Sequence, residues 1–156
     1  VAGLPTYTLA GELALGVTLR GTLPRPDFSA ALRRTAPPAW DGDAAFSLLM
    51  AEGYAARGDP VAVAGLLARA LLGSAHARLA ARGAWALNEK GIVARAGLED
   101  AADVLAAVGW TPERLGASVA RMRAHLRLER PGDLRFDAVV RGQERRAPPT
   151  RADSDS

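Results

Sequence analysis

Apolar residues recur at helical spacing over most of residues 26–128. The most regular stretch begins at Asp59 and Pro60. This pair is typical of a helix start, because aspartate caps free N–H groups and proline suits the first helical position. The stretch predicts one long helix, then a loop, and a short helix over 92–96. The long helix is expected to bury one face, made of Val63, Leu66, Leu67, Ala70, Leu71 and Ser74.

Two helices are predicted before this segment. The first should end at Pro37 and Pro38, because a proline inside a helix removes a backbone hydrogen bond and clashes with the preceding turn. The second should begin at Asp41 or Asp43 as its cap and end at Gly58. Its apolar stripe is predicted at Phe46, Leu49, Met50 and Tyr54.

Two further helices are predicted towards the C-terminus, over 98–108 and 111–128. Thr111 has the character of an N-cap and Pro112 that of a first helical residue. Trp110 is expected to anchor the turn between the two helices. The core side of the second is predicted at Leu115, Val119, Met122 and Leu126.

The predicted fold is all-α, an orthogonal bundle of about six helices over residues 26–128. Residues 1–25 are interpreted as a remnant of, or linker from, a neighbouring domain, because the alternating stretch VTLRGTL has no strand partner. Residues 129–156 mix arginines, acids, prolines and serines, and they predict a disordered polar tail. An exposed apolar patch is expected near the N-terminus, around Tyr7, Leu9, Leu13 and Leu19.

Composition narrows the classes of function. With 0 cysteines the chain has no disulfide or thiolate metal site, and two isolated histidines, His76 and His125, are read as surface residues rather than zinc ligands. The net charge is only +3, and no basic run is interleaved with aromatics, which argues against nucleic-acid binding. No secretory signal or apolar run of about 18 residues is recognised. The expected location is therefore the cytoplasm, without membrane contact.

Candidate chemistry concentrates in the tetrad Asn88-Glu89-Lys90-Gly91. Lys90 is the only lysine among 20 basic residues, and Asn88 is the only asparagine. A lysine ammonium is a compact charge that suits a phosphate, whereas arginine presents a wide planar fork. On the long helix, Gly65 and Gly73 flank the face of Arg69, so either a ligand or another helix is expected to approach closely there.

Structural explanations stand beside these functional ones. Asp59 is fully explained as an N-cap, and Arg69 as a solvated surface residue. Asn88 and Glu89 are explained by capping of the short helix. The pair Asp41 and Asp43 is read as helix-capping acids and not as a metal motif, because no Gly-Ser turn precedes it.

The segment GDPVAVAGLLAR, followed after a loop by NEKG, resembles the C-terminal helical domain of nucleotidyltransferases of the aminoglycoside-adenylyltransferase type. The resemblance covers roughly residues 7–128 and rests on short motifs. It implies that Asp59, Arg69 and Glu89 bind substrate, and that Asn88 and Lys90 bind the nucleotide. It also implies that residues 1–25 adjoin a nucleotidyltransferase domain that the chain lacks.

The family's catalytic signature, a Gly-Ser turn followed by an Asp-x-Asp pair that holds Mg²⁺, is absent from this sequence. The resemblance therefore predicts no catalytic and no metal-binding residue here, and ATP and Mg²⁺ are expected only with the missing domain. The expected function is the C-terminal part of an ATP-dependent nucleotidyltransferase, inactive alone, whose acceptor is a small cationic molecule such as an aminoglycoside. Two alternatives remain open: a helical interaction module that partners a separate nucleotidyltransferase domain, and a decayed fragment.

Overall fold

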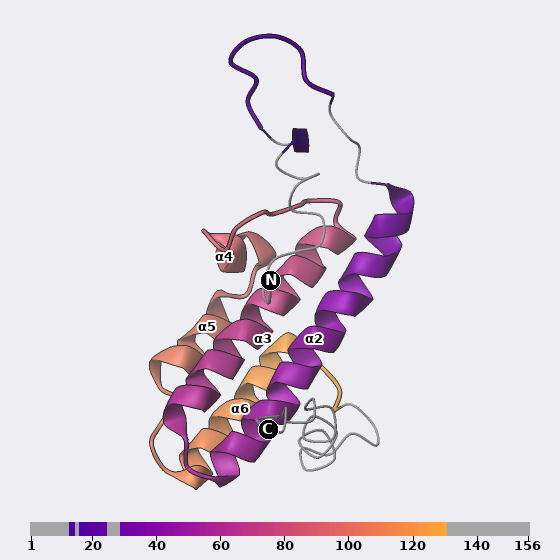
Figure 1. Cartoon of the computed structure of the whole chain (residues 1–156). Coiled ribbons are helices and arrows are strands. Elements are labelled where there is room, and N and C mark those ends of the chain that lie inside the picture. The colour runs from indigo at the N-terminus through magenta and orange to yellow at the C-terminus, as the bar shows by residue number, and fades with distance from the viewer. Residues whose placement is uncertain (1–12, 15, 25–28, 131–156) are drawn as a thin grey trace, which may run out of the picture.

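The structure, a computed structural model, describes residues 13–14, 16–24 and 29–130 and is all-helical there, without strands. Figure 1 shows the two longest helices, α2 and α3, side by side and antiparallel. The helices are α2 (Ala30–Ala56), α3 (Pro60–Ala81), α4 (Ile92–Ala96), α5 (Glu99–Ala106) and α6 (Pro112–Leu126).

The described residues thus form five helices in place of about six, because the two helices predicted before residue 58 are one. α2 runs unbroken through Pro37 and Pro38, and its N-cap is Ser29, whose side chain accepts a hydrogen bond from the Leu32 amide. Asp41 and Asp43 consequently lie inside the helix and cap nothing. The orthogonal arrangement is likewise not confirmed.

Packing explains why α2 continues through its prolines. Leu32, Ala36 and Trp40 form a small apolar cluster with Ala80 at the end of α3 and with Trp85 in the following loop. A helix break at residue 37 would move Leu32 and Ala36 away from Ala80 and Trp85. Burial of this cluster offsets the missing hydrogen bonds of Pro37 and Pro38.

The main core lies between α2, α3 and α6. The predicted buried face of α3 is confirmed, with Leu66 only partly buried, and so is that of α6. On α2 the predicted stripe is only partly correct: Leu49 is buried, but Phe46, Met50 and Tyr54 are half-exposed. The face of α2 that enters this core is instead made by small residues and one leucine: Ala44, Leu48, Ala51 and Ala55.

Small residues let α2 and α3 approach closely. A methyl group added at Gly73 would lie 3.4 Å from both the Ala44 Cβ and the Trp40 carbonyl oxygen. Gly65 has open space around it. A ligand or another helix was expected to approach these glycines closely. The crossing of α2 explains Gly73, whereas nothing approaches Gly65.

The ends of the chain meet the bundle differently. In the N-terminal segment Leu19 is 95% exposed, as predicted, whereas Leu13 is half-exposed and Tyr7 and Leu9 lie outside the described residues. At the other end, the first residues of the predicted tail contact the bundle: the Arg130 guanidinium pairs with Glu52 at 2.7 Å. Residues 131–156 lie outside the described residues.

One described helix, α3, has the length and composition of a membrane span, with a mean hydropathy of 1.3 in its most apolar window. The prediction that no apolar run of this length exists is therefore corrected. Half of that window is buried inside the bundle, which is the pattern of a core helix.

The unbroken α2 makes Pro38→Ala a direct test. Pro38 is exposed, so the substitution loses no packing and restores the amide hydrogen bond to Arg34. We expect the free energy of unfolding to rise by about 1 kcal/mol or more, since an interior proline costs about 3 kcal/mol, part of which is returned by the stiffer unfolded chain. Urea unfolding followed by circular dichroism measures this. The matched variant Ala39→Pro should lose stability, and a loss with Pro38→Ala would mean that the helix does break here.

Candidate functional site

The tetrad lies in the loop between α3 and α4, and Asn88, Glu89 and Lys90 are all exposed. The Asn88 Oδ1 accepts a hydrogen bond from the Lys90 amide at 3.1 Å, an Asx turn that fixes the loop just before Gly91. Gly91, the N-cap residue of α4, has φ 66°, which favours glycine. Asn88 therefore closes a turn within the loop and does not cap the short helix as predicted. Among the described residues the Lys90 ammonium has no hydrogen bond or ion pair.

Asp59 serves as the N-cap of α3, and its Oδ1 accepts a hydrogen bond from the Ala62 amide at 2.9 Å. The tetrad follows the other end of this 22-residue helix, whose length is about 33 Å. α4, which begins just after the tetrad, contacts α3 near that far end through the Arg78 guanidinium and the Gly97 carbonyl oxygen. Asp59 is therefore not brought to the tetrad.

Arg69 is held by Asp43 of α2. Its Nη2 lies 2.6 Å from Asp43 Oδ1 and its Nε donates to Oδ2 at 3.2 Å, a two-point contact. The hydrogen bond and charge of Asp43 raise the pKa of Arg69 above its usual range. The Asp-Gly-Asp pair thus supplies a partner for an arginine on the neighbouring helix, and the Arg69 guanidinium is already bonded.

His76 is a buried ionisable side chain, although the sequence analysis placed it on the surface. His76 is only 6% exposed and stacks on Trp40, with ring centroids 4.5 Å apart and planes 13° apart. Burial lowers the pKa of His76, and the negative charge of Glu89 partly opposes this shift. Glu89 therefore lies within electrostatic reach of a buried imidazole.

Asp41 is a second perturbed group on α2. Burial raises the pKa of its carboxyl group, and the positive charge of Arg78 partly opposes the shift. Arg78 itself donates hydrogen bonds to the carbonyl oxygens of Gly97 and His125. Asp41, His76 and Arg78 thus lie in the halves of α2 and α3 nearer to the tetrad.

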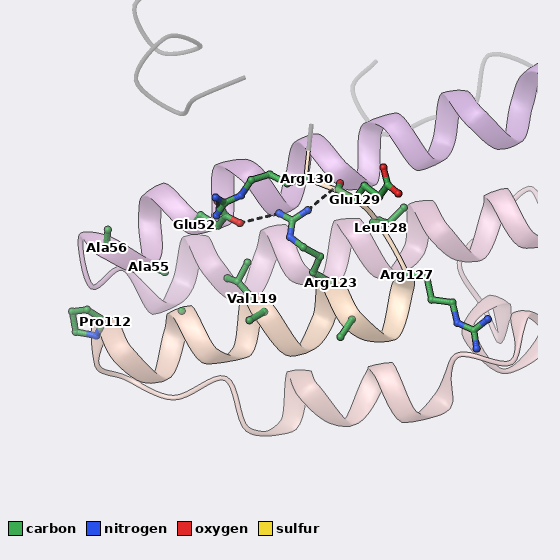
Figure 2. Close-up of a pocket in the computed structure, with 13 residues that line it drawn as sticks. Glu52, Ala55, Ala56, Pro112, Val119, Arg123, Arg127, Leu128, Glu129 and Arg130 are labelled. Atoms are coloured by element: carbon green, nitrogen blue, oxygen red, sulfur yellow. Dashed lines mark hydrogen bonds and ion pairs between the residues drawn. The ribbon is translucent and has the colours of Figure 1, made fainter. Parts of the chain in front are cut away.

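A cavity of about 730 Å³ lies between the C-terminal half of α2 and α6. Figure 2 shows Glu52 held between Arg123 and Arg130 at its edge, at 3.0 Å and 2.7 Å. Apolar residues such as Ala55 and Ala120 line much of the rest, and Arg127 and Glu129 also line it. Because the one carboxylate in this ion-pair network is bonded to two arginines, the network ties residue 130 to the bundle.

A cavity of about 740 Å³ lies beside the turn between α5 and α6. Val61 and Trp110 line it, and both are 79% exposed. Trp110 therefore does not anchor the turn between the helices as predicted; Ser118 bonds it instead, through its Oγ and the Val108 carbonyl oxygen at 2.9 Å. Neither this cavity nor the one at Glu52 is lined by any of the five predicted site residues.

The described residues contain no group of three or more His, Asp or Glu side chains able to hold a metal ion. No family model, curated protein or solved structure matches this chain. The geometry therefore reduces the predicted site to three neighbouring residues, Asn88, Glu89 and Lys90. His76, which sequence reasoning missed, lies within electrostatic reach of Glu89, and the only available signal was its position on the same helix as the predicted core.

We expect the stability of the protein to depend on His76 at pH values below about 6.5, the unfolded pKa of histidine. The folded pKa is lowered, so below the unfolded value of about 6.5 the unfolded chain binds a proton that the folded protein does not. The free energy of unfolding should fall as the pH falls from about 6.5 towards the folded pKa. Urea unfolding at a series of pH values should show a smaller slope for His76→Gln. His125→Gln is the control, and equal slopes for the wild type and His76→Gln would contradict this assignment.

The structural roles of Asp59 and Arg69 can be compared directly. Asp59→Ala should lower the free energy of unfolding by about 1 kcal/mol through loss of the N-cap. Arg69→Ala should cost less than about 1 kcal/mol, because its pair with Asp43 is half-exposed. Urea unfolding measures both. A larger loss for Arg69→Ala than for Asp59→Ala would reverse this ranking.

Proposed function

We propose that this chain is the C-terminal helical part of an ATP-dependent nucleotidyltransferase that adenylylates a hydroxyl of a small cationic acceptor such as an aminoglycoside. In this proposal residues 26–128 form the helical substrate- and nucleotide-binding domain, and a separate nucleotidyltransferase domain holds the metal. The observation that carries it is the tetrad: one turn fixes the Lys90 backbone, while its ammonium is exposed. The resemblance of NEKG and the segment before it to that family supports the assignment.

Within the tetrad the residues have different tasks. Lys90 would neutralise phosphate oxygens of ATP, for which a compact, exposed ammonium is suited. Asn88 positions Lys90 through its hydrogen bond to the Lys90 amide. Glu89, which is also exposed, would attract a cationic acceptor. Asp59 and Arg69 keep the structural roles described above and are not part of this proposed site.

The donor set fits only part of the expected ligand. Lys90 suits a phosphate, but the described residues offer no cluster of carboxylates for Mg²⁺. When bound, the metal would stabilise charge on the phosphates, and in this proposal the partner domain supplies its ligands. The chain alone is therefore expected to transfer nothing.

A second candidate, a helical interaction module for a separate nucleotidyltransferase domain, is favoured by the exposed apolar residues of the N-terminal segment. Val17 and Leu19 are 84% and 95% exposed, and Leu23 is 53% exposed. Such a module would bind the domain through these side chains without using Lys90. Leu19→Asp would then abolish complex formation, whereas Lys90→Ala would leave both binding and transfer unchanged.

The test joins the chain to a nucleotidyltransferase domain with the Gly-Ser and Asp-x-Asp signature and follows adenylylation of an aminoglycoside panel by mass spectrometry. We expect no transfer by the 156-residue chain alone and transfer by the joined protein. Lys90→Ala should lower kcat/KM at least about tenfold, the value of one charge-assisted contact. Arg114→Ala on α6 is the control and should change it less than about twofold. Transfer by the chain alone, or equal effects of the two substitutions, would refute the proposal.

A further inference from the structure

A third cavity, of about 600 Å³, lies where α3 and α6 end and α4 gives way to α5. Its charged and titratable lining residues are Arg78, Arg82, Asp100, His125 and Arg127. The volume lies within the range of small-molecule sites. The tetrad does not line this cavity, so any ligand here is separate from the one proposed for Lys90.

The charges that line this cavity are mainly positive. Three arginines and one acid, Asp100, line it, and none of the ion pairs among the described residues involves Arg78, Arg82 or Arg127. The C-terminal ends of α3 and α6 work against an anion, because their free carbonyl groups carry partial negative charge. Arg78 offsets part of that field by donating to one carbonyl oxygen at each of two helix ends.

Arg78 is also positioned before any ligand arrives. Its Nη1 donates to the Gly97 carbonyl oxygen at 3.2 Å and its Nη2 to the His125 carbonyl oxygen at 3.4 Å. A guanidinium has five N–H donors, so these two contacts leave donors for a ligand. Because the group is held by two helix ends, little conformational freedom would be lost on binding.

Arg127 has an unusual backbone conformation for an arginine. Four helices end in the same way, with a residue of positive φ followed by an amide that bonds back five residues. At three of these ends that residue is Gly58, Gly83 or Gly97; at the end of α6 it is Arg127, with φ 57°. Arg127 is the only described non-glycine residue with positive φ.

Glycine adopts this conformation without the steric penalty that a side chain adds. The sequence therefore keeps a strained arginine where its other helices use glycine, and strain of this kind is typical of functional positions. Figure 2 shows the Arg127 side chain pointing away from the ion pairs of Glu52. Its charge is thus directed away from the carboxylate that Arg123 and Arg130 share.

We propose that this cavity, formed by Arg78, Arg82 and Arg127, is a binding site for the phosphate group of a small molecule. The planar forks of arginine match the oxygens of a phosphate, and charge-assisted hydrogen bonds of this kind are the strong ones. Asp100 lowers the affinity for a simple anion, since it places a negative charge in the same cavity. The site does not depend on ATP, on a metal or on a second domain.

The experiment titrates the full 156-residue chain with inorganic pyrophosphate by calorimetry. We expect saturable binding with a dissociation constant of about a millimolar or lower. Arg127→Gly and Arg82→Gln should each weaken it about tenfold, the value of one charge-assisted contact. Asp100→Asn should tighten it by removing the repelling carboxylate.

Arg127→Gly separates binding from folding. Glycine suits the positive φ, so this variant should unfold at a higher urea concentration than the wild type while binding more weakly. The matched control is Arg34→Gln, which removes an exposed arginine that lines none of the three cavities.

Four results would overturn the proposal: no saturable binding, unchanged affinity in Arg127→Gly, an equal loss in Arg34→Gln, or citrate binding as tightly as pyrophosphate. Unchanged binding after Lys90→Ala would support it, because the two sites are separate. Failure here would leave the proposed transfer activity untouched, since that rests on the tetrad and a second domain.

Discussion

The close approach of α2 to α3 is the constraint on which the rest of the structure depends. Gly73 leaves room for the Ala44 Cβ and the Trp40 carbonyl oxygen, each 3.4 Å from where its own Cβ would lie. This contact fixes the register of the two helices. With that register set, Trp40 stacks on His76 and Asp43 meets Arg69. The same pairing lets Ala80 at the end of α3 and Trp85 in the tetrad loop pack against Ala36 of α2.

Much of the fold was predictable from local pattern, and the failure at α2 shows the limit of that reasoning. α3 and α6 carry capping residues and regular apolar faces, so sequence and structure agree on them. Pro37 and Pro38 are strong local signals for a break, yet they were overridden. The burial of Leu32 and Ala36 against Trp85, a residue far along the chain, is not visible in any short window of sequence.

The candidate site was predictable to the extent that it is local. Composition pointed to Asn88 and Lys90, and Lys90 is exposed, but Asn88 accepts from the Lys90 amide instead of capping the short helix as predicted. The grouping of Asp59 and Arg69 with the tetrad depended on tertiary placement: α3 separates Asp59 from the tetrad, and Arg69 is bonded to Asp43. Burial of His76 likewise depends on where Trp40 falls after the helices pair.

Several arginines among the described residues donate to backbone carbonyl groups. The carbonyl oxygen of Gly97 accepts from Arg78, that of Trp85 from Arg95, and that of Ala107 from Arg121. These bonds join the ends of helices to loops and to one another. A planar group with several donors suits that task, and a lysine would satisfy fewer acceptors at fixed angles. Among the described residues, the only lysine makes no such bond. Arg82 and Arg127 also make no such bond, so Lys90 is set apart by its residue type and its exposure, and not by a lack of partners.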